Sequence, residues 1–87
     1  MRDEQTKAAA LQYRAGIDTA PLIVAKGKGH VAEKILAIAR EHGIPIREDR
    51  NMVEILSTLN LYEEIPPDLY KAVAEILAFI YKMSGRL

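Results

Sequence analysis

The residues best placed to do chemistry are Lys26, Gly27, Lys28 and Gly29, followed by His30. They stand between a β-branched run and a helical pattern, where backbone N–H groups and a helix N-terminus can hold an anion. The spacing matches neither a Walker A loop, G-x-x-x-x-G-K-[ST], nor a dinucleotide loop, G-x-G-x-x-G. The pattern therefore favours a solvated turn, with an anion, an acidic protein or a lipid headgroup as its alternative ligands.

The histidines and acidic pairs do not assemble a catalytic or metal site. His30 and His42 are separated by about 18 Å along one predicted helix, too far apart to share a metal ion. The pairs Glu48-Asp49 and Glu63-Glu64 are predicted to be solvated, without the separated pKa values that acid–base catalysis needs. The chain contains no cysteine. The sequence thus predicts no catalytic residue, no cofactor and no metal site.

The aromatic residues fall on or beside predicted helices at spacings typical of a core. Tyr62, Phe79 and Tyr81 are predicted to pack rather than to form a platform for nucleic-acid bases. Tyr70 differs, because it follows two prolines at a helix start, where an exposed proline and aromatic patch can bind protein. The full set of predicted protein-binding residues is Pro21, Lys26, Gly27, Lys28, Gly29, Pro66, Pro67 and Tyr70.

Length and charge restrict the function further. The 87 residues suit a single domain over 1–87, with fraying expected at 1–7 and 84–87. Twelve basic and twelve acidic residues cancel, so no global field favours nucleic acid. Apolar runs fall short of the roughly 20 residues that span a bilayer, and the polar N-terminus is unlike a signal peptide. We expect a soluble, cytoplasmic protein-binding domain without direct membrane insertion.

Two strands are expected in the first third of the chain. Residues 8–13 form a short run that ends near Gly16, and we interpret it as a strand. Residues 22–25 are β-branched and apolar, follow Pro21 and precede the lysine–glycine run. This second segment is typical of a strand buried on both faces.

Three helices and a further strand are expected in the rest. Helical spacing of Val31, Ile35, Ile38 and Ala39 predicts a helix that stops at Gly43, and residues 44–46 then form a strand parallel to 22–25. Asn51 is expected to cap a second helix that runs to Leu59. Pro66 and Pro67 begin the last helix. Its predicted core stripe is Leu69, Val73, Ile76, Leu77 and Ile80.

The resulting fold class is α/β (α+β mixed). The expected order is β-β-α-β-α-α, a small mixed sheet of about three strands covered by helices.

Three stretches, at residues 20–27, 38–46 and 64–78, resemble the cytoplasmic C-terminal domain of the FlhB/YscU family. These are export-gate switch proteins of bacterial flagella and type III secretion systems. The resemblance runs in order from residue 8 to residue 81. It implies a cytoplasmic domain that contacts export-gate components, export substrates and the length-ruler protein, and that helps to change which substrates are accepted.

The same resemblance implies two differences from full-length members. Those cleave themselves at Asn-Pro-Thr-His, and the aligned residues here are Asp3, Glu4, Gln5 and Thr6, so no self-cleavage is expected. The family's transmembrane region and preceding strand have no counterpart before residue 8. The chain resembles small stand-alone FlhB-like proteins, and one sheet edge is expected to be exposed as a possible site of strand addition.

Three hypotheses follow. The first is an accessory export domain that presents the turn at 26–29 and the helix start at 66–70 to protein partners. The second is a small anion- or nucleotide-binding regulator that uses Lys26 and Lys28. The third is self-cleavage that survives with altered residues.

Overall fold

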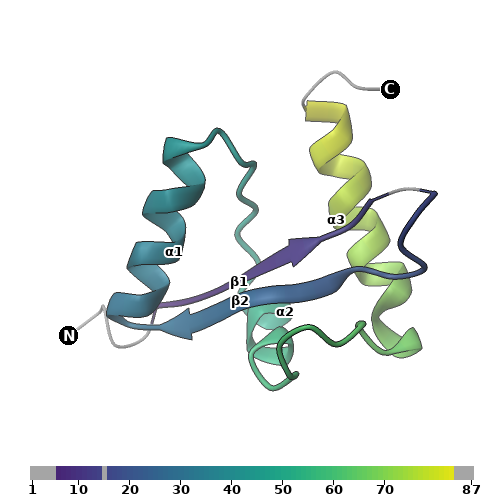
Figure 1. The fold of residues 1–87 in the computed structure, drawn as a ribbon, viewed down its shortest axis with the longest axis horizontal. Coiled ribbons are helices and arrows are strands. Elements are labelled where there is room, and N and C mark those ends of the chain that lie inside the picture. The colour runs from purple at the N-terminus through teal and green to yellow at the C-terminus, as the bar shows by residue number, and fades with distance from the viewer. Residues whose placement is uncertain (1–5, 15, 84–87) are drawn as a thin grey trace.

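The computed structural model describes the backbone of residues 6–14 and 16–83 and the side chains of all these residues up to 78. The elements are arranged as a small sheet with helices on both sides (Figure 1). In chain order they are β1 (Lys7–Gln12), β2 (Leu22–Lys28), α1 (His30–Glu41), α2 (Arg50–Leu56), the short 3₁₀ helix η2 (Pro67–Leu69) and α3 (Tyr70–Met83). The mixed α/β class predicted from the sequence is confirmed.

The strands β1 and β2 are antiparallel neighbours. Ala8 lies opposite Gly27 and Ala9 opposite Lys26, and successive residues of a strand point to opposite faces. A side chain at Gly27 would meet Val31 of α1, whereas the Lys26 ammonium contacts the residues that follow α2. The helices α1 and α2 therefore cover opposite faces of the sheet.

The predicted third strand and its parallel pairing are wrong. The sheet formed by the described residues has two strands, and 44–49 connects α1 to α2 without strand structure. A β-branched stretch becomes a strand only when a neighbour offers main-chain partners. Residues 62–65 instead lie beside β2: the Tyr62 N–H donates to the Ile23 carbonyl at 2.7 Å, and the Ile65 N–H to Pro21 at 3.1 Å.

The core lies between the sheet, α2 and α3. Ile23, Ile65 and Val73 are its largest fully buried side chains. Three other predicted stripe residues, Leu69 of η2 and Ile76 and Leu77 of α3, pack partly buried against this cluster. The side chain of Ile80 lies outside the described residues. The buried cluster comprises Ala20, Ile23, Met52, Leu56, Ile65 and Val73.

Helix α1 ends at Glu41, and Gly43 just beyond it provides the predicted stop. Gly43 has φ 67°, and the Ile44 N–H donates to the Ala39 carbonyl at 2.8 Å, which closes the last turn. The predicted apolar stripe is partly wrong, because Val31 and Ile38 are 54% and 45% exposed. A sheet of two strands covers only a narrow strip of the helix, centred on the buried Ala32.

Helix α2 begins and ends earlier than predicted. Its cap is Asp49, whose carboxylate accepts from the Met52 N–H at 2.9 Å, rather than Asn51. The helix ends at Leu56 instead of Leu59. The Leu59 N–H donates to the Leu56 carbonyl, only three residues back. This tighter turn takes the chain out of the α-helical path.

The expected fraying of residues 1–7 does not reach Lys7, the first residue of β1. Thr6 is also held, since its carbonyl accepts from the Gly29 N–H at 2.9 Å. Residues 1–5 and 84–87 lie outside the described part of the chain.

Candidate functional site

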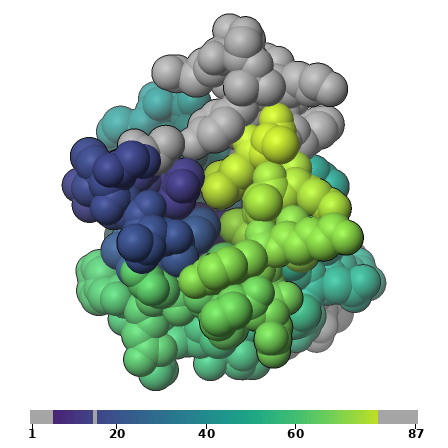
Figure 2. All heavy atoms as spheres, turned by 90° about the vertical axis from the view of Figure 1, so that its right-hand side faces the viewer, coloured from purple at the N-terminus to yellow at the C-terminus, as the bar shows by residue number. Residues whose placement is uncertain are grey.

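A mainly apolar groove of about 300 Å³ lies between the segment 13–21 and α3. Figure 2 faces this side, where the segment that leads into β2 (blue) lies against α3 (yellow-green). The groove brings together two of the predicted protein-binding residues, Pro21 and Tyr70, which are far apart in the sequence. It is lined by Tyr13, Thr19, Ala20, Pro21, Tyr70, Val73, Ala74 and Leu77.

The helix side of the groove is set by the prolines that precede α3. Pro66 is the N-cap residue and Pro67 the first residue of η2, and the Leu69 N–H donates to the Pro66 carbonyl at 2.9 Å. The fixed φ of proline suits these positions. Neither proline lines the groove; they position Tyr70, which is 43% exposed at the start of α3.

The wall opposite α3 is anchored by polar contacts. The Thr19 hydroxyl donates to the Glu64 carboxylate at 2.6 Å, which joins the loop to the segment beside β2. Ala20 and Pro21 are buried. This wall is therefore attached to the segment beside β2 and packed into the core.

The loop before this wall is closed by Arg14 and Asp18. The Arg14 guanidinium donates to both carboxylate oxygens, at 3.0 and 3.2 Å, and the Arg14 backbone N–H donates at 2.8 Å. These hydrogen bonds, the side-chain ones first, lower the pKa of Asp18 below its ordinary value. The side-chain hydrogen bond between the Arg14 guanidinium and Asp18 also raises the pKa of Arg14.

We expect Asp18→Asn to lower the melting temperature at pH 7 and to have a smaller effect at pH 2. A depressed folded-state pKa stabilises the protein above the unfolded value of about 3.9, and this contribution is lost as pH falls through the folded value. Thermal melts of both proteins across this range measure the difference. The exposed carboxylate of Glu75 is the control: Glu75→Gln should show no such trend. An Asp18→Asn deficit of equal size at both pH values would contradict the ionic explanation.

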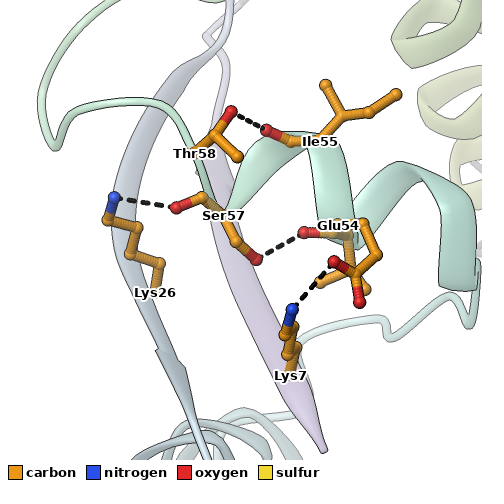
Figure 3. A network of polar contacts seen from close by, with 7 residues as sticks. Lys7, Lys26, Glu54, Ile55, Ser57 and Thr58 are labelled. Carbon is orange, nitrogen blue, oxygen red and sulfur yellow. Dashed lines mark hydrogen bonds and ion pairs between the residues drawn. The ribbon is translucent and has the colours of Figure 1, made fainter.

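The predicted turn at 26–29 is mostly strand. Lys26, Gly27 and Lys28 belong to β2, and the turn is at Gly29, with φ 61°. The Lys26 ammonium donates to the Ser57 carbonyl at 3.0 Å (Figure 3). It also donates to the Leu59 carbonyl. It thus binds carbonyls of the segment that follows α2.

A second hollow of about 390 Å³ lies between the strands and the end of α2, and it is bordered by Lys26, Gly27 and Lys28. Lys28 is exposed and lies opposite Lys7, whose ammonium forms an ion pair with Glu54 at 2.8 Å (Figure 3). Two lysines that line this hollow, Lys7 and Lys26, therefore already contact groups of the protein. The lining is Lys7, Lys26, Gly27, Lys28, Glu54, Ser57 and Thr58.

The other candidate groups do not form a site. His30 and His42 lie at opposite ends of α1, and among the described residues no three His, Asp or Glu side chains are grouped closely enough to hold a metal ion. Tyr62, predicted to pack, is 71% exposed with φ 65°. The side chains of Phe79 and Tyr81 are outside the described part. No helix within residues 16–83 is long and apolar enough to cross a bilayer.

Sequence reasoning missed several residues of the groove. Tyr13, Ala74 and Leu77 line it, although Tyr13 was assigned to a strand and Leu77 to the core. The spacing of positions 70, 74 and 77 was a usable signal, because residues four and three apart share one face of a helix. The partner segment could not be identified this way, since it lies about fifty residues earlier.

The model of the family described as FlhB, HrpN, YscU and SpaS matches residues 5–80. The chain is 49% identical over 83 residues to the uncharacterized protein YlqH of Bacillus subtilis, covering 92% of this chain and 89% of YlqH. It is 43% identical over 74 residues to the flagellar biosynthetic protein FlhB of Aquifex aeolicus, covering 84% of this chain and 21% of FlhB. The chain thus spans about a fifth of that relative's length.

Solved structures show the same fold. The C-terminal domain of PscU superposes with a TM-score of 0.81 at 32% identity, covering 85% of this chain and 95% of that one. A mutated EscU/SpaS C-terminal domain gives 0.80 at 27% identity, with 85% and 90% covered. Sequence, family model and fold agree over most of the chain, which therefore belongs to the FlhB, HrpN, YscU and SpaS family.

Proposed function

We propose that this chain is a protein-binding domain that acts in flagellar or type III protein export and receives a segment of its partner in the groove beside α3. The main support is the groove, where Pro21 and Tyr70 lie together in a mainly apolar hollow. The chain that carries this groove belongs to an export family. Several relatives are flagellar biosynthetic proteins. We infer export-gate components, export substrates or the length-ruler protein as partners, met at the cytoplasmic side of the export apparatus.

The lining of the groove supports binding rather than catalysis. Its aliphatic and aromatic side chains can receive the apolar side chains of a partner segment, while the Tyr70 hydroxyl and the Thr19–Glu64 pair provide polar edges. Burial of a few apolar side chains in a preformed groove is a usual source of interface energy. We propose no enzymatic activity and no cofactor.

We expect Ala74→Glu to reduce capture of export proteins at least tenfold while leaving the fold intact. Ala74 is exposed, lies in α3 and lines the groove, so a glutamate is compatible with the helix but places a charge among apolar side chains. The purified chain is immobilised, exposed to export-gate domains, length-ruler protein and export substrates from its own organism, and the retained proteins are quantified by mass spectrometry.

The matched control is Ala37→Glu, which adds the same charge at an exposed alanine of α1, on the other face of the sheet. It should bind as the unmodified chain does. Recovery of no export protein by the unmodified chain would refute the proposed function. Equal recovery by Ala74→Glu would refute the groove as the binding surface.

The other two hypotheses receive less support. The anion-binding regulator depends on Lys26, whose ammonium already donates to two carbonyls. Self-cleavage by the family chemistry needs an Asn-Pro bond, and the asparagines here, Asn51 and Asn60, precede Met52 and Leu61. We propose that the chain does not cleave itself, so the immobilised protein should keep its full mass throughout the binding experiment.

A further inference from the structure

Several charged side chains around the groove occur in pairs of opposite sign. The residues that line the groove are themselves uncharged. In the loop before the groove, the Arg14 guanidinium forms an ion pair with the Asp18 carboxylate at 3.0 Å. On α3, Lys71 and Glu75 are exposed and stand four positions apart, the spacing at which side chains of a helix are neighbours. The opposite charges of each pair largely cancel at the groove.

Glu64 brings a charge to the groove that no such pair balances. Its carboxylate accepts from the Thr19 hydroxyl at 2.6 Å, and Thr19 lines the groove. This hydrogen-bond partner is neutral, so the negative charge remains. Glu64 is exposed, whereas the next residue, Ile65, is 2% exposed and belongs to the core. The carboxylate therefore lies at the surface, at the Thr19 end of the groove.

The backbone and the hydroxyl together fix the position of this carboxylate. Glu64 forms an isolated antiparallel bridge with Leu22, and the Ile65 N–H donates to the Pro21 carbonyl at 3.1 Å. The Thr19 hydroxyl occupies one carboxylate oxygen, and a carboxylate has lone pairs for further donors. Because the side chain is already held, less rotamer freedom is lost when a cation of a ligand pairs with it.

We propose that Glu64 selects partner segments in which a lysine or arginine stands close to the apolar residues that enter the groove. This inference rests on the proposed binding at the groove and specifies the chemistry of the bound segment. A lysine or arginine there meets the opposite charge of Glu64, while an acidic residue meets a like charge. Both groups stay in contact with water, so the preference is about fivefold rather than orders of magnitude.

Two matched sets of fluorescein-labelled peptides test this selection by fluorescence anisotropy. The peptides are Lys-Ser-x-x-x-Ser-Lys and Glu-Ser-x-x-x-Ser-Glu, where each x is Leu, Ile or Phe. A charge at both ends makes the comparison independent of the direction in which the peptide lies. Among the peptides that bind most tightly, the lysine form should have a dissociation constant about fivefold lower than the glutamate form in about 20 mM salt, and the difference should shrink in about 500 mM salt.

Variants at one position separate the charge from the rest of the groove. Glu64→Gln keeps an oxygen that accepts from Thr19 but removes the charge, so the two sets should bind equally. Glu64→Lys should reverse the preference. Glu63→Gln is the matched control, since it makes the same change at the exposed preceding residue, and it should retain the preference.

The outcomes distinguish this proposal from the proposed function. Equal binding of the two sets by the unmodified chain, or a preference that persists in Glu64→Gln, would overturn the role of Glu64 and leave binding at the groove intact. Peptide binding that Ala74→Glu does not weaken, or no saturable binding of either set, would overturn the groove as the binding surface and this proposal with it.

Discussion

Replacing Ile23 with alanine should destabilise the domain by about 2–5 kcal/mol. Ile23 is fully buried near the start of β2, and it packs in the cluster that joins α2 and α3 to the sheet. Truncation removes buried methyl groups and leaves a cavity that these elements cannot close without losing contacts. A domain of this size has a total stability of about 5–15 kcal/mol, so a large share can be lost.

Urea unfolding followed by circular dichroism measures the effect. Ile17→Ala removes the same atoms from a side chain that is 70% exposed, and it should change the free energy of unfolding by about 0.5 kcal/mol or less. A loss below 1 kcal/mol for Ile23→Ala would contradict the central role of Ile23. Because the groove wall leads directly into β2, capture of export proteins by the immobilised chain should fall in parallel with the folded fraction.

Gly27→Ala should cost about 1–3 kcal/mol, although alanine is otherwise acceptable in a strand. A Cβ at Gly27 would lie 2.2 Å from the Val31 Cγ1 and 2.7 Å from the Val31 Cβ. Rotation of the valine side chain can move the Cγ1 but not the Cβ. The first turn of α1 therefore has to shift away from the sheet.

The double variant Gly27→Ala with Val31→Gly tests this cause. Removal of the valine Cβ relieves the contact, so the two changes together should cost less than the sum of their separate effects, measured from thermal melts. Lys28→Ala, at the exposed neighbouring position of β2, is the control and should be nearly neutral. Simple additivity of the two changes would show that the loss arises elsewhere.

Local patterns in the sequence were enough to predict most of the helices and strands. The short run that ends near Gly16 indicates the first strand, and the β-branched run after Pro21 indicates the second. The stop at Gly43 follows from its ability to adopt positive φ. Pro66 and Pro67 mark the start of the last helical segment, because a fixed φ suits that position. The ordered family stretches identify the family. Such features depend on the chemistry of neighbouring residues, so they can be read without knowledge of the fold.

The tertiary structure decided what those elements contact. Residues 44–46 have the composition of a strand but meet no partner strand among the described residues, and 62–65 take the place beside β2. Lys26, expected in a solvated turn, binds carbonyls at the end of α2. The groove itself joins Pro21 to Tyr70 across about fifty residues. Strand pairing, burial and groove formation require groups from distant segments, and local periodicity carries no information about which segments meet.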